Sequence, residues 1–72
     1  MKLPVLSGRE CVKALQKIGF QFERQKGSHL MLYRESSATP VVVPDHKELD
    51  RGTLRGIIRQ AGLSVDEFVE LL

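Results

Sequence analysis

The sequence predicts a small α+β domain in which one helix precedes three antiparallel strands and two further helices follow them. Apolar side chains recur at helical spacing near both ends of the chain. Between these stripes lie short alternating or β-branched runs separated by turn-forming residues, which are typical of strands. At 72 residues the chain has the length of one domain. We therefore expect residues 1–72 to form a single domain of order α-β-β-β-α-α, with the helices on one face of the sheet.

Three N-cap signals support the helices. Ser7 with Glu10, and Ser64 with Glu67, have the spacing of a capping box, and Asp50 can cap the helix between them. The apolar stripes that follow predict the buried sides of the three helices: Cys11, Ala14, Leu15 and Ile18; then Leu54, Ile57, Ile58 and Ala61; then Val65, Phe68, Val69 and Leu72.

Three short segments predict the strands. Residues 20–24 alternate apolar with polar side chains, as a half-buried strand does. Residues 25–28 can reverse the chain into a second strand at residues 30–34. After a polar loop at residues 35–39, three valines with a proline at each end predict a short third strand at residues 40–44.

The second strand decides where His29 points. Leu30 and Leu32 share one face of this strand, and His29, Met31 and Tyr33 share the other. If the leucines face the core, His29 points away from it, whereas a slip of one residue would invert the assignment. The sequence thus favours an accessible histidine over a buried structural one.

Composition and charge limit the classes of function. Residues 1–62 carry eleven Lys/Arg against six Asp/Glu, a balance of +5, and residues 63–72 carry three acids and no Lys/Arg, a balance of −3. A basic body favours a polyanionic partner, the alternative being an ordinary solvated surface. No apolar run approaches the roughly 20 residues of a membrane span, and no signal peptide is visible. We expect a cytoplasmic protein without a membrane association.

Metal and cofactor chemistry is poorly supported. His29 and His46 are separated by 17 residues and have no paired carboxylates beside them, and no Gly-rich nucleotide-binding loop is present. The single cysteine, Cys11, lies on an apolar stripe, so we interpret it as a core residue rather than a nucleophile. We expect no metal and no cofactor.

The chemistry that remains is proton transfer at a phosphodiester. His29 lies close to Arg24 and Lys26, and Gly27 lets the backbone approach a ligand. RNA carries its own nucleophile, the 2′-hydroxyl, so its cleavage needs a proton-transfer group and positive charge. Ser28 is no partner for His29, because adjacent strand residues point to opposite faces. His46 is either a second acid–base group or an exposed loop histidine.

The ordered motifs of nearly the whole chain resemble HicA toxins, also called the YcfA family. The resemblance rests on Arg24-Gln25-Lys26-Gly27-Ser28-His29, Tyr33, Val43-Pro44, His46, Gly52-Thr53-Leu54-Arg55 and Arg59-Gln60-Ala61-Gly62. It implies a double-stranded-RNA-binding-domain-like fold and an mRNA interferase, a metal-independent endoribonuclease of a type II toxin–antitoxin system. It also implies a HicB-type antitoxin that occludes the active site. The loop at residues 35–39 lacks glycine, a departure that bears only on the hairpin geometry.

The resemblance assigns the catalytic role to His29, which follows Gly27-Ser28 as the family's histidine follows its Gly-Ser pair. On physical grounds we assign the RNA contacts to a set of cations and turn amides: Arg24, Lys26, Gly27 and Ser28, with Lys47, Arg51 and Arg55 as further candidates.

Two other functions remain open. The chain could be a noncatalytic RNA-binding module of the same fold, in which replacing His29 weakens binding only mildly. A DNA-binding repressor is less supported, because no helix-turn-helix spacing appears and DNA contact in this family normally belongs to the antitoxin.

Overall fold

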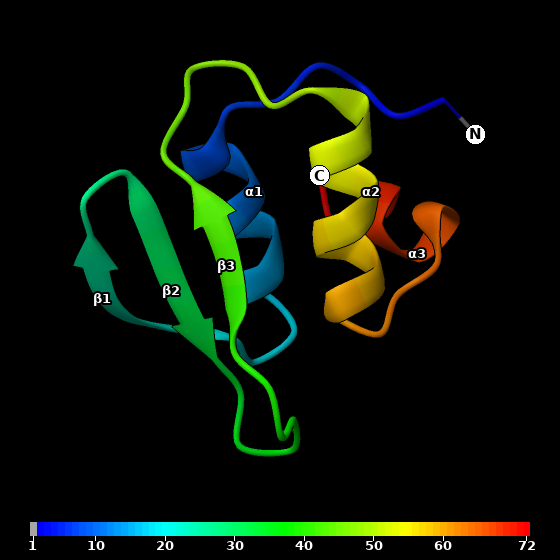
Figure 1. Ribbon diagram of the computed structural model, residues 1–72. Coiled ribbons are helices and arrows are strands. Elements are labelled where there is room, and N and C mark those ends of the chain that lie inside the picture. Colours follow the sequence, from blue (N-terminus) through cyan, green and yellow to red (C-terminus); the bar gives the residue numbers. More distant parts are fainter. Residues whose placement is uncertain (1) are drawn as a thin grey trace.

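The computed structural model describes residues 2–72 and confirms the predicted α+β order (Figure 1). The elements are α1 (Gly8–Gln16), β1 (Gln21–Lys26), β2 (His29–Tyr33), β3 (Val41–Pro44), α2 (Arg51–Gln60) and α3 (Val65–Val69). The strands form one antiparallel sheet in the order β1-β2-β3. Helices α1 and α2 both contact β3, and α3 packs against α2.

The three predicted N-caps are all formed. The Ser7 and Ser64 hydroxyls accept from the backbone N–H groups of Glu10 and Glu67, whose side chains accept from the N-cap amides in return. Asp50 accepts from the Thr53 backbone N–H at 2.7 Å. Each helix therefore begins where its polar signal predicts.

The sheet has a buried face and an exposed face, as the parity of β2 predicts. Leu30 and Leu32 are buried, whereas His29 and Tyr33 are exposed. We call the exposed side the outer face. By strand register and alternation its residues are Gln21, Arg24, Lys26, His29, Met31, Tyr33, Val42 and Pro44.

The core joins the sheet to the helices, and it differs from the expectation at several positions. Leu72 is 48% exposed, because α3 ends at Val69 and the chain after it turns Leu71 partly inward. β1 is not half-buried: all six of its residues are exposed, since it is the edge strand furthest from α2. The core also includes leucines outside the predicted stripes: Leu3, Leu6 and Leu49.

Among residues 2–72, none of the helices has the length and apolar character needed to cross a membrane.

Candidate functional site

His29 begins β2 directly after a two-residue turn. Gly27 adopts a left-handed backbone conformation with φ of 59°, which a side chain would strain. Ser28 completes the turn, and its carbonyl oxygen accepts from the backbone N–H of Asp45 at 2.6 Å. His29 lies between Lys26 of β1 and Pro44 of β3 in the register of the sheet. The turn thus presents an exposed imidazole at the end of the outer face.

A β-bulge brings the two cations of β1 to the same face as His29. The register pairs Phe22 with Leu32 and then Arg24 with Met31, so Glu23 is an extra residue in β1. Simple alternation from Phe22 would turn Arg24 towards the inner face. The bulge reverses the alternation of side chains along β1, and Arg24 and Lys26 therefore lie on the outer face. The Arg24 guanidinium lies 4.0 Å from the Glu23 carboxylate, and both side chains remain largely exposed.

A network of polar contacts supports the turn that precedes His29. Asp45 accepts two hydrogen bonds from the Arg9 guanidinium, both at 3.1 Å, which raise the pKa of Arg9. The Gln25 amide donates to the Gly27 carbonyl at 3.0 Å and approaches Asp45 at 3.5 Å. Together with the Asp45 amide on Ser28, these contacts join α1, β1 and the end of β3 around the turn.

The start of α1 fits closely against the same region. The Gly8 amide donates to the His46 carbonyl at 2.9 Å, and a Cβ at Gly8 would collide with the Pro44 carbonyl oxygen. Only glycine allows this approach. The His46 side chain is exposed on the connection that follows β3.

The remaining predicted cations form a separate group. Lys47, Arg51 and Arg55 are exposed on the β3–α2 connection and on α2. Figure 1 shows the β1–β2 turn, this connection and the beginning of α2 at the same end of the molecule. Among residues 2–72, no hydrogen bond or ion pair links these three cations to the turn of His29. The turn and the strand register therefore bring Arg24, Lys26, Gly27 and Ser28 together with His29, whereas Lys47, Arg51 and Arg55 lie on other elements at the same end of the molecule.

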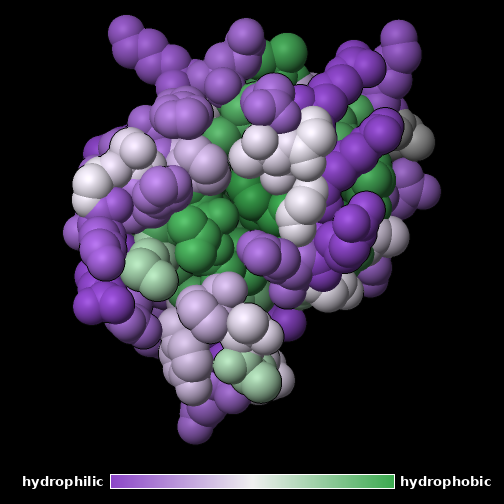
Figure 2. Space-filling view, in the orientation of Figure 1, coloured by the Kyte–Doolittle hydropathy of each residue, from purple (hydrophilic) through white to green (hydrophobic). Residues whose placement is uncertain are grey.

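The centre of the outer face is apolar. Met31 and Val42 are register partners and are partly buried. In Figure 2 a hydrophobic patch lies over the middle of the strands, and hydrophilic residues surround it. His29 and its neighbouring cations thus border a surface that can also pack against an apolar group.

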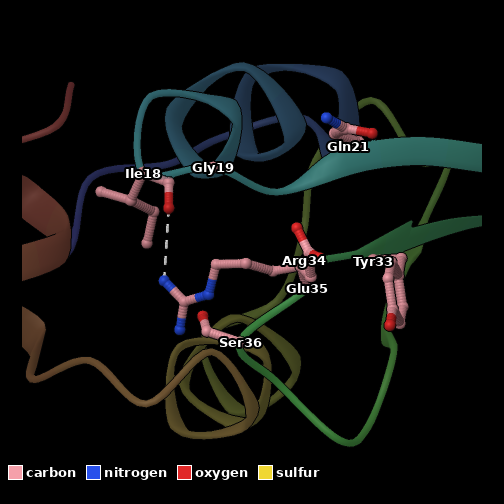
Figure 3. A pocket seen from close by; sticks show the side chains of 7 residues that line it. All are labelled: Ile18, Gly19, Gln21, Tyr33, Arg34, Glu35 and Ser36. Carbon is pink, nitrogen blue, oxygen red and sulfur yellow. Dashed lines mark hydrogen bonds between the residues drawn. The ribbon is translucent and has the colours of Figure 1, made fainter.

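Arg34 directly follows the end of β2, and no sequence pattern indicates its role. Its guanidinium donates to the Ile18 carbonyl at 3.3 Å and to the Ala61 carbonyl at 3.4 Å, and lies 4.4 Å from the centre of the Phe20 ring. Figure 3 shows Arg34 reaching towards Ile18, whereas Tyr33 points away from it. Arg34 thus connects the ends of α1 and α2 and is turned away from the outer face.

Two further observations bear on the chemistry. Cys11 is fully buried, and burial raises the pKa of its thiol to about 12, so it has the core role that the sequence predicts. Within residues 2–72, no group of three or more His, Cys, Asp or Glu side chains is placed to hold a metal ion.

Comparison with known proteins places these features in a family. Residues 8–63 match the family described as HicA toxin of bacterial toxin–antitoxin systems. Among solved structures, the chain is similar to a chain of a toxin–antitoxin complex from Streptococcus pneumoniae. The two are 37% identical with a TM-score of 0.73, and the match covers 81% of this chain and 98% of that chain. A search of curated protein sequences returns no significant match.

Fold and family match together define a toxin of a toxin–antitoxin system. The chain belongs to the HicA toxin family, as its motifs predict, and its α+β fold agrees with that family's double-stranded-RNA-binding-domain-like fold.

Proposed function

We propose that this toxin is an mRNA interferase, an endoribonuclease in which His29 is the acid–base group. The observation that carries the proposal is the exposed imidazole in register with Lys26, on the face to which the bulge adds Arg24. The two cations would bind phosphates and stabilise the charge that develops on the phosphorane. The turn amides of Gly27 and Ser28 would donate to the same phosphate, and Lys47, Arg51 and Arg55 would bind the RNA further away.

The proposed reaction is a transesterification in which the 2′-oxygen displaces the 5′-oxygen at phosphorus. The 2′-oxygen attacks phosphorus and loses its proton, the P–O5′ bond breaks, and the departing oxygen gains a proton. The products are a 2′,3′-cyclic phosphate and a 5′-hydroxyl. One imidazole carries out one proton transfer, and water or His46 carries out the other. Since the substrate supplies the nucleophile, this chemistry requires no metal ion or cofactor.

We further propose that a HicB-type antitoxin neutralises the toxin by covering the outer face. The similar chain from Streptococcus pneumoniae comes from a toxin–antitoxin complex. Here the apolar centre at Met31 and Val42 would give such a partner a surface to bury beside His29. Contact there would exclude RNA without any change of fold.

The test compares purified wild-type toxin, His29→Ala and His46→Ala on a labelled mRNA, and compares growth when each is expressed without antitoxin. We expect His29→Ala to reduce the cleavage rate by roughly 10²–10⁴-fold and to abolish growth arrest. His46→Ala tests the second proton transfer: a comparable decrease would assign it to His46, and an unchanged rate would assign it to water. Equal cleavage by wild type and His29→Ala would refute the catalytic role. Tight RNA binding without cleavage would instead support a noncatalytic RNA-binding module.

A further inference from the structure

Tyr33 has a position on the outer face that the proposed catalytic group does not explain. It is the last residue of β2, is 43% exposed, and shares its face with His29 and Met31. Four residues of extended chain separate it from His29, which is about 13 Å. At this distance Tyr33 lies beyond the phosphate that His29 would reach, but a short run of single-stranded RNA can contact both residues.

The surroundings of Tyr33 suit a base better than a phosphate. The ring lines two open hollows, one with Gln21 and Glu23 and the other with Arg34 and Glu35. Both hollows carry a carboxylate, which repels phosphate. The Arg34 guanidinium also lines one hollow, but it is directed inward, where it donates to the backbone carbonyls of Ile18 and Ala61 (Figure 3).

The neighbouring strand β1 carries the cations that would bind the RNA phosphates. Arg24 and Lys26 lie on β1 beside Met31 and His29, at the turn end of the sheet. A backbone held by these cations would leave its bases free to lie over Met31 and then against Tyr33. A base can do this only when it is not stacked within a duplex.

We propose that Tyr33 is a stacking platform for an unpaired base outside the scissile nucleotide, and that it gives the toxin a preference for single-stranded RNA. This inference rests on the proposed function of His29 and adds a binding subsite to it. Stacking on an aromatic ring tolerates any base, so the subsite distinguishes single-stranded from double-stranded RNA but does not distinguish one sequence from another.

The experiment uses His29→Ala, which should cleave too slowly to disturb a binding measurement, and a short single-stranded RNA in which one abasic position is moved along the RNA. Removing the base that lies on Tyr33 should weaken binding roughly 5- to 150-fold at that position and little elsewhere. Adding Tyr33→Ala should weaken binding to the intact RNA by a similar factor and abolish the dependence on the abasic position, because the two changes remove the same contact. Tyr33→Phe keeps the ring and should restore most of the affinity.

The chain offers a direct optical readout as well. Tyr33 is the only tyrosine and there is no tryptophan, so tyrosine emission reports this ring alone. Single-stranded RNA should quench the emission, and the same sequence in a duplex should not. The scan and the emission signal need no Tyr33 variant, so they hold even if Tyr33→Ala folds poorly.

The outcomes separate the two proposals. Suppose that wild type cleaves RNA, but that binding does not depend on the abasic position and RNA does not quench the tyrosine emission. That result would refute the subsite and leave the role of His29 intact. Absence of both cleavage and RNA binding would refute both.

Discussion

At the scale of single residues, the site depends on a few backbone positions as much as on its side chains. Parity along β2 was sufficient to predict that His29 is exposed, because Leu30 and Leu32 on either side of Met31 identify the inner face. The supports of the turn could not be predicted in the same way. Arg9 and Asp45 are 36 residues apart, and nothing in the local sequence of either indicates the other.

Asp45 supports the turn of His29 through its contacts with Arg9 and Gln25. In Asp45→Ala the Arg9 and Gln25 side chains lose their shared partner, so the turn of His29 should become less well positioned, while loss of a negative charge should favour RNA binding. We expect kcat to fall by about tenfold and KM to stay constant or decrease. Steady-state kinetics of cleavage measure both, with Glu48→Ala as a matched removal of an exposed carboxylate. An unchanged kcat would show that the network does not position His29.

At the scale of elements, the order of helices and strands followed from patterns that the sequence displays locally. Capping boxes and apolar stripes specify where each helix begins and which side it buries. Segments without a periodic pattern were less predictable: Leu3, Leu6 and Leu49 enter the core from irregular backbone. The bulge in β1 had no signal either, because Glu23 is an ordinary solvent-exposed residue.

The N-caps predict how stability depends on pH. Hydrogen bonds from the capped amides lower the pKa values of Glu10, Asp50 and Glu67. A carboxyl group with a lower pKa in the folded state contributes stability above its unfolded pKa, near 4, and loses it as pH falls through the folded value. We therefore expect the free energy of unfolding to decrease as pH falls below about 4.5. Urea unfolding between pH 3 and 7 measures this dependence.

The control for this prediction is the triple variant Glu10→Gln, Asp50→Asn and Glu67→Gln. Its amides still accept hydrogen bonds but do not titrate, so its unfolding free energy should vary less with pH in the same range. If the unfolding free energies of both proteins depend equally on pH, groups other than these three carboxylates cause the dependence.

At the scale of the whole molecule, a small core is held together by contacts between distant segments. A domain of this size buries a modest fraction of its surface, so individual tertiary contacts matter for its stability. Arg34 is the clearest of these, since it joins α1, α2 and Phe20 through one guanidinium. Its role depends on tertiary contacts, which explains why the sequence pattern did not reveal it.

Replacing Arg34 tests this connection. Arg34→Ala removes two hydrogen bonds and the contact with the Phe20 ring, and should destabilise the fold by about 2 kcal/mol. For a domain of this size that corresponds to a decrease in Tm of about 10 °C. Thermal unfolding followed by circular dichroism measures it, with Arg59→Ala on the exposed side of α2 as the matched control. Equal Tm values for the two variants would show that the contacts of Arg34 do not stabilise the fold.

The bulge at Glu23 also affects how related chains should be compared with this one. Alternation counted back from the turn places Lys26 and Arg24 on the same face as His29. Alternation counted forward from Phe22 would place them on the opposite face. In a relative whose first strand is one residue shorter, a gap at the bulge would therefore leave the side chains beside the histidine unchanged, whereas a gap nearer the turn would exchange the two faces of the strand. In an alignment of such chains, a gap of one position in this strand carries more chemical information than most substitutions.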